Sequence, residues 1–174
     1  MVLATGYMDV FLLPDFYAFD MEKTKDKLEI ILKYFGDFTP TQLKQLEQLD
    51  SLYQEWNAAI NVISRKDIDS LYEKHVLHSL AIAAWFNFSP GVEIIDIGTG
   101  GGFPGIITAI MLAQQGTGWV HLVESNNKKA AFLRTALTET GARGSVHALR
   151  IEAAVDAVPA ADYVSARALA DLDG

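Results

Sequence analysis

The spacing of apolar residues divides the chain into two parts that meet near residue 90. In the first part, apolar residues recur at steps of three and four, as on the buried face of an amphipathic helix. The pattern predicts three helices, over residues 22–35, from Pro40 to about Trp56, and over 67–86. Thr39 before Pro40 provides an N-cap followed by proline at the first helical position. Pro90-Gly91 then ends this helical part.

The second part alternates short β-branched runs with helical segments. Strands are predicted over 92–97, 119–124, 146–151 and 162–166, and helices over 103–115 and 128–140. Asn126 or Asn127 is a suitable N-cap for the later helix, and Gly141 a suitable end. Alternation of strand and helix favours an α/β fold with a parallel sheet and right-handed crossovers.

Composition narrows the classes of function. The chain has 174 residues, no cysteine, four histidines and a net charge of −8. The lack of cysteine excludes disulfides and thiolate chemistry, and so few histidines argue against a histidine-rich metal cluster, so no metal site is expected. The negative charge argues against a broad phosphate-binding surface, so any nucleic acid would be held by a local basic patch, a protein partner or chain outside this sequence.

The N-terminal segment lacks the features of a targeting sequence. No lysine or arginine precedes the short apolar stretch Val10–Leu13, and Pro14 follows it directly. A signal peptide needs a basic start, and a membrane span needs about 20 apolar residues. We therefore expect a cytoplasmic protein without a membrane partner, in which Met21 is the natural start and the first 20 residues are extra chain. Residues 1–21 are accordingly set apart from the helical cap as an extra or disordered segment.

A glycine-rich turn follows the first predicted strand. It holds glycines at positions 98, 100, 101 and 102, and the next helix starts near Phe103-Pro104. Glycine lets a backbone turn tightly and approach a ligand closely. Together with Gly105 these residues match the GxGxxG pattern of dinucleotide-binding proteins, which alone is a weak signal.

Two carboxylates sharpen this interpretation. Glu124 ends the second predicted strand, where an acidic residue can accept hydrogen bonds from both hydroxyls of a ribose. Asp96 precedes the turn, and a carboxylate there would repel a pyrophosphate but attract a sulfonium or ammonium cation. The pair therefore favours S-adenosylmethionine over a nicotinamide dinucleotide. The structural alternative is that Asp96 only caps the turn and the glycines only allow close packing.

Several further segments resemble motifs of one family. In order and spacing, six segments are similar to motifs of the GidB/RsmG methyltransferases: Trp56–Asn61, His75–Leu80, Asp96–Gly105, Lys128–Arg134, Arg150–Glu152 and Ser165–Ala168. The resemblance covers roughly residues 22–174. It implies S-adenosylmethionine-dependent methylation of guanine N7 in small-subunit (16S) ribosomal RNA, with that RNA or the assembling subunit as partner and no DNA.

The resemblance also implies a fold and a set of site residues. The fold would be a class I, Rossmann-like methyltransferase sheet, here incomplete with about four strands over 91–174, and a helical cap over 22–90. The implied cofactor-binding residues are Asp96, Gly98, Gly100, Gly102, Phe103, Glu124, Ile151 and Glu152. Arg167 would be catalytic, and the implied substrate-binding residues are His75, Lys128, Arg150 and Arg167.

Departures from the family pattern leave alternatives open. His78 and Glu124 stand where aspartate is frequent, and the chain ends where family members continue, so we expect a truncated chain of reduced stability and uncertain activity. Other possibilities are a cofactor-binding fragment without activity, a methyltransferase of small molecules or proteins, and a nicotinamide-dependent oxidoreductase. His75 could instead be a packed core histidine, Lys128 part of a solvated face, and Arg167 a structural ion-pair partner.

Overall fold

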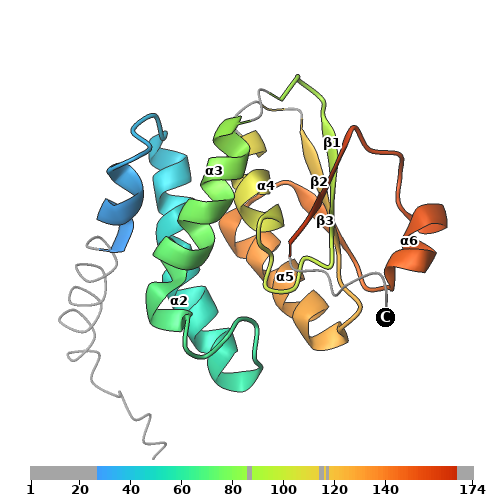
Figure 1. Cartoon of the computed structure of the whole chain (residues 1–174), viewed down its shortest axis with the longest axis horizontal. Helices are drawn as coiled ribbons and strands as arrows, with labels where there is room; N and C mark the ends of the chain where they lie inside the picture. The colour runs from blue at the N-terminus through green and yellow to red at the C-terminus, as the bar shows by residue number, and fades with distance from the viewer. Residues whose placement is uncertain (1–26, 86–87, 114–115, 117, 168–174) are drawn as a thin grey trace, which may run out of the picture.

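The computed structural model describes residues 27–85, 88–113, 116 and 118–167. The segment 1–21 that we expect to be extra chain lies outside these residues, as does the end of the chain after Arg167. Within the described residues, a helical part precedes four strands that alternate with helices (Figure 1).

The first part is helical, as the apolar spacing predicts. After helical residues 27–32 comes α2 (Pro40–Ala59). Thr39 caps α2 as expected: its hydroxyl accepts from the Gln42 amide, and the Gln42 side chain accepts from the Thr39 amide, which forms a complete capping box.

The third predicted helix is not one continuous α-helix. It consists of a 3₁₀ turn over Ile68–Ser70, a π-helical turn over Tyr72–Val76, and α3 (Leu77–Trp85). The prediction of one helix over 67–86 is wrong in this respect, because the spacing of buried side chains does not reveal the switch from one backbone hydrogen-bond pattern to another. π turns inside helices occur often at functional sites, and this one contains His75.

The second part is a parallel sheet, which confirms the α/β prediction. Its strands are β1 (Glu93–Ile97), β2 (Trp119–Val123), β3 (Gly144–His147) and β4 (Tyr163–Ala166), in the order β3-β2-β1-β4. All three pairings are parallel, so the carboxyl ends of the strands lie at one edge of the sheet. Ligands of open α/β sheets bind at that edge.

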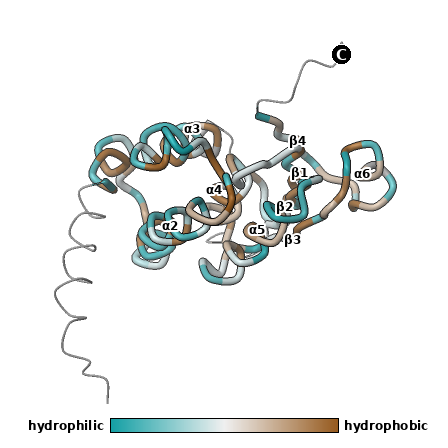
Figure 2. Tube along the Cα trace, turned by 90° about the horizontal axis from the view of Figure 1, so that it is seen from below, coloured by the Kyte–Doolittle hydropathy of each residue, from teal (hydrophilic) through white to brown (hydrophobic). Residues whose placement is uncertain are grey.

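Helices cover the two faces of the sheet unequally. Figures 1 and 2 show α4 (Gly105–Ala113) and α5 (Asn127–Thr140) between the sheet and the pair α2 and α3, with α6 (Ile151–Ala157) on the opposite side. One core cluster joins the helical part to the sheet, and it includes Tyr53, Ile106 and Phe132. A smaller cluster under α6 contains Val123 and Ala154.

Two sequence predictions in this part need correction. The third strand occupies Gly144–His147 rather than 146–151, and the apolar residues at the end of the predicted strand belong to the following turn and to α6. α6 itself was not predicted, because seven residues give too short a window for helical periodicity. No helix in the described portion of the chain has both the length and the apolar content needed to cross a bilayer.

Candidate functional site

The glycine turn after β1 adopts a backbone conformation that favours glycine. Gly98, Gly100 and Gly102 have φ angles of 61°, 57° and 88°. A Cβ on Gly102 would lie only 2.5 Å from the Ile106 side chain, so this glycine also permits close packing. At Gly100 the nearest atom to an added Cβ is the Gly98 carbonyl oxygen at 3.8 Å, so this part of the turn is open. The turn therefore packs tightly at Gly102 and leaves room at Gly100.

Asp96 fastens the turn to its surroundings. Its side chain is fully buried. It accepts hydrogen bonds from the Thr99 hydroxyl at 2.5 Å, the Gly105 amide at 2.9 Å and the Ser165 hydroxyl at 2.8 Å. Burial raises the pKa of Asp96, and these three donors lower it in part. These three contacts tie β1 to the turn, α4 and β4.

Glu124 stands directly after β2 and touches the turn. One of its carboxylate oxygens accepts from the Gly100 amide at 3.0 Å, and the other accepts from the Asn126 amide at 2.7 Å. The side chain is 8% exposed. A carboxylate has about four lone-pair sites, so each oxygen retains acceptor capacity for a ligand hydroxyl. Asn126 in turn caps α5, as predicted.

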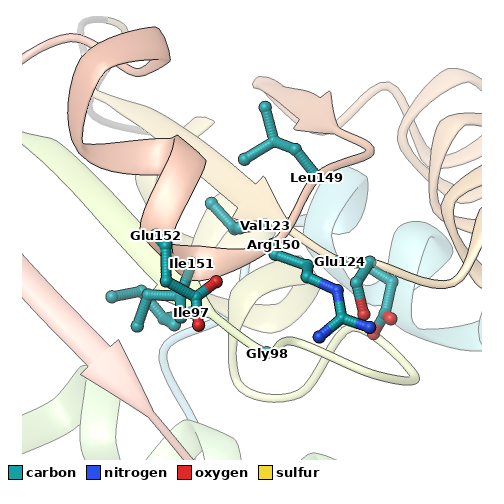
Figure 3. Close-up of a pocket in the computed structure, with 9 residues that line it drawn as sticks. Ile97, Gly98, Val123, Glu124, Leu149, Arg150, Ile151 and Glu152 are labelled. Carbon is teal, nitrogen blue, oxygen red and sulfur yellow. The ribbon is translucent and has the colours of Figure 1, made fainter.

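A cavity of about 220 Å³ opens beside Glu124 at the carboxyl edge of the sheet. Its lining comes from the ends of β1 and β2 and from the start of α6: Ile97, Gly98, Val123, Glu124, Ser125, Leu149, Arg150, Ile151 and Glu152. Figure 3 shows Glu124 and Arg150 on one side of it and Glu152 on the other. The structure thus brings five of the sequence-predicted residues, from three separate segments, to one pocket.

Arg167 follows β4 and contacts the helical part. Its guanidinium lies 2.8 Å from Nδ1 of His75 and 5.6 Å from the centre of the Phe103 ring. His75 stacks on the same ring at a centroid distance of 5.0 Å. Since arginine only donates, Nδ1 of His75 is the acceptor and its ring is neutral. Burial lowers the pKa of His75, and the charge of Arg167 lowers it further, in agreement with that neutral form.

The remaining predicted residues occupy different surroundings. Phe103 is buried and also stacks on Tyr53 at 5.1 Å, so it lies behind the turn and not in the cavity. Lys128 is exposed in the first turn of α5. In the described residues, the site has two regions, the cavity beside Glu124 and the cluster of Arg167, His75 and Phe103.

The contact of Tyr53 with the glycine turn was not predicted from the sequence. The helical spacing of Tyr53 indicated only a core residue, and it is indeed fully buried. Its hydroxyl also donates to the Gly101 carbonyl, so α2 holds the glycine turn from behind. Burial raises the pKa of Tyr53, which keeps that donor proton in place. The only available signal was a tyrosine in an otherwise leucine-rich stripe.

Comparison with known proteins gives a consistent result. The model of a family described as GidB, rRNA small subunit methyltransferase G, matches residues 42–174. Ribosomal RNA small subunit methyltransferase G of Rhizobium meliloti (strain 1021) is 55% identical over 131 residues, and the protein of the same name from Sinorhizobium medicae (strain WSM419) is 52% identical over 131 residues. Each match covers 75% of this chain and 60% of the relative.

The chain therefore spans about three fifths of the length of these relatives. Among solved structures, a mutant of MtNAS matches with a TM-score of 0.48 and 19% sequence identity, over 94% of this chain and 66% of that chain. A likeness of that extent supports no further conclusion.

Proposed function

Because the chain belongs to the rRNA small subunit methyltransferase G family, we propose that it binds S-adenosylmethionine at the carboxyl edge of its sheet and serves methyl transfer to guanine N7 of small-subunit (16S) ribosomal RNA. The observation that carries the proposal is the contact between Glu124 and the turn at Gly100, where the turn is open, beside the cavity that Ile151 and Glu152 line. The parallel sheet and helical cap agree with a class I methyltransferase fold.

The residues of the cavity fit the nucleoside end of this cofactor. The cavity has a volume of about 220 Å³, which is less than the roughly 300–1,000 Å³ of pockets that enclose a whole small molecule, so it suits only part of the cofactor. In our proposal Glu124 accepts from the ribose hydroxyls, and Ile151 and Glu152 meet the adenine. The methionine part then lies along the backbone of Gly98 and Gly100, outside the closed part of the pocket.

Bound S-adenosylmethionine would supply an electrophilic methyl group on a sulfonium sulfur. Asp96 is buried and would not touch this cation. Its negative charge would instead stabilise the sulfonium electrostatically across the turn. Phe103 and Gly102 would support the turn from behind. Each of these residues therefore binds or positions the cofactor, and none needs to accept a proton.

Transfer to guanine N7 requires little chemistry from the protein. N7 carries a lone pair and no hydrogen, so attack on the methyl group needs no general base. The task of the site is to align the nucleophile with the methyl group and to exclude water. Arg167 offers a rigid fork of donors for the guanine edge or a phosphate, and we propose that His75 positions this fork. Arg150 and Lys128 would provide further positive charge for the RNA.

Calorimetric titration with S-adenosylhomocysteine tests the cofactor site directly. The chain should bind this product, and NADH should not compete. Glu124→Gln should weaken binding about 10- to 150-fold, because a hydrogen bond to a charged group contributes about 1.5–3 kcal/mol. Glu139→Gln, an exposed substitution of the same chemistry on α5, should bind like the wild type. Unchanged affinity in Glu124→Gln would contradict the proposed site.

Transfer of a labelled methyl group tests the reaction. The chain, incubated with labelled S-adenosylmethionine, should methylate small-subunit rRNA or the small subunit at guanine N7. If the chain binds S-adenosylhomocysteine but transfers no methyl group, it binds the cofactor without catalysis, and the catalytic part of the proposal is rejected. Transfer to protein or small molecules but not to RNA would reject the substrate.

A further inference from the structure

A second and larger cavity, of about 550 Å³, lies on the helical side of the glycine turn. We name it the loop–helix pocket after its lining, which is the loop that follows α2 and one residue of α5: Asn61, Val62, Ile63, Ser64, Arg65 and Lys129. Val62 and Ile63 are buried and form a firm base, and Arg65 is exposed at the rim. None of the roles assigned above uses this pocket.

The charge of the loop–helix pocket is positive, in contrast to that of the whole chain. Arg65 and Lys129 are its only charged lining residues, although the chain carries 22 acidic residues against 14 basic ones. Neither takes part in an ion pair with any other residue that the structure describes. The Nε–H of Arg65 donates to the Asn61 side chain at 2.9 Å, which holds the guanidinium and leaves its other N–H groups available.

The pocket adjoins the proposed cofactor site through both of its walls. A Cβ on Gly101 would lie 2.7 Å from Cγ2 of Ile63 and 3.0 Å from the Val62 carbonyl oxygen, so the loop packs directly on the glycine turn. The wall that carries Lys129 begins at Asn126, whose amide donates to Glu124. A ligand in the loop–helix pocket would therefore sit next to the glycine turn, and the pocket shares no lining residue with the cavity beside Glu124.

We propose that the loop–helix pocket binds a backbone phosphate of the RNA substrate and so fixes the strand beside the target guanine. A polar pocket with two unpaired cations and no carboxylate suits a phosphate group, and the arginine fork matches phosphate geometry while lysine acts as a point charge. This inference rests on the proposed function, since it names the part of the RNA that the chain contacts. It also explains how an acidic protein holds RNA, through a local cationic pocket.

The salt dependence of RNA binding tests the inference. Affinity for a small-subunit rRNA transcript is measured by fluorescence anisotropy at a series of KCl concentrations, for the wild type and for Arg65→Gln/Lys129→Gln. Glutamine keeps an amide beside Asn61 while removing each charge. The double variant should lower the slope of log affinity against log salt by about 0.7, because the pocket holds one phosphate and each phosphate contact on a single strand contributes about 0.7.

The matched control is Lys33→Gln/Lys44→Gln, which removes two charges from exposed lysines. Lys44 lies in the first half of α2, at the opposite end of that helix from the pocket. The control should keep the wild-type slope. Urea unfolding of all variants establishes that each is folded.

The outcomes separate this inference from the proposed function. If the wild type binds RNA and methylates it, but Arg65→Gln/Lys129→Gln keeps the full slope, the phosphate pocket is wrong and the function stands. If the double variant loses as much affinity for S-adenosylhomocysteine as for RNA, the two cations bind the cofactor and the inference is overturned. If the wild type binds S-adenosylhomocysteine but no RNA, the proposed RNA substrate fails, and this inference fails with it.

Discussion

Replacing Gly105 with alanine should destabilise the fold strongly, because this glycine allows α4 to approach the sheet. An added Cβ would overlap Cδ2 of Leu122 and lie 2.6 Å from Oδ2 of Asp96. Leu122 is fully buried in β2, and Asp96 is held by three hydrogen bonds. Neither neighbour is free to move away, so the helix itself must shift from the strands.

The cost of that shift has two parts. Overpacking in a well-packed core costs about 1–3 kcal/mol. Displacing α4 also stretches the hydrogen bond from the Gly105 amide to Asp96, and a weakened bond to a buried charge adds about 1–3 kcal/mol. We expect the free energy of unfolding to fall by about 2–6 kcal/mol, which is a large share of the 5–15 kcal/mol typical of a domain.

Equilibrium unfolding in urea, followed by tryptophan fluorescence, measures this loss. With a slope of about 1–3 kcal/mol per molar urea, the midpoint should fall by at least about 0.7 M. Gly36→Ala is the matched control, since a Cβ there meets no atom within 4 Å, and its midpoint should stay the same or rise slightly. Equal midpoints for Gly105→Ala and the wild type would refute the reasoning.

Three further predictions concern the residues around the site. Arg167→Ala should keep the affinity for S-adenosylhomocysteine but lower methyl transfer at least about tenfold, since a contact of about 1.4 kcal/mol made in the transition state is lost; unchanged transfer would remove Arg167 from the reaction. The free energy of unfolding should fall as the pH drops below about 6.5, because the folded chain lowers the pKa of His75 and so binds its proton less readily than the unfolded chain. His75→Phe, which preserves the stack on Phe103, should reduce the difference in unfolding free energy between pH 7.5 and pH 5.5, as measured by urea titration. If the variant and the wild type show the same difference, His75 is not the group responsible. Ser165→Ala should cost about 1–3 kcal/mol of unfolding free energy, because it removes one of the donors to buried Asp96; a urea midpoint equal to that of the wild type would argue against this contact.

Local signals in the sequence predicted the elements that have strong periodicity or a cap. The capping residues Thr39 and Asn126 begin α2 and α5 as expected, and β1 and β2 match their apolar runs within one residue. The third strand was placed too late because it begins at Gly144, a residue that is rare in strands. A Cβ at this position would lie 2.6 Å from the Val120 carbonyl oxygen, so the reason for the glycine is the neighbouring strand.

The candidate site was predictable only in part. The glycine turn and Glu124 follow from motif spacing, since both depend on residues near in sequence to a strand end. The contact between Arg167 and His75 joins residues 92 positions apart. The spacing of apolar residues does not predict which side chains come into contact over such a distance in sequence. The loop–helix pocket has the same origin, because Arg65 and Lys129 come together only after the helical part packs on the sheet.

The order of the strands affects how the chain folds during synthesis. β1 pairs on one side with β4, and the hydrogen-bonded residues Asp96 and Ser165 are 69 positions apart. A ribosome adds about 5–20 residues per second, so one edge of β1 waits about 3–14 seconds for its partner strand. During this interval the apolar strand Glu93–Ile97 presents unpaired backbone groups, which can pair with other nascent chains. The earliest strand of the sheet is thus the one that most needs protection while the protein is being made.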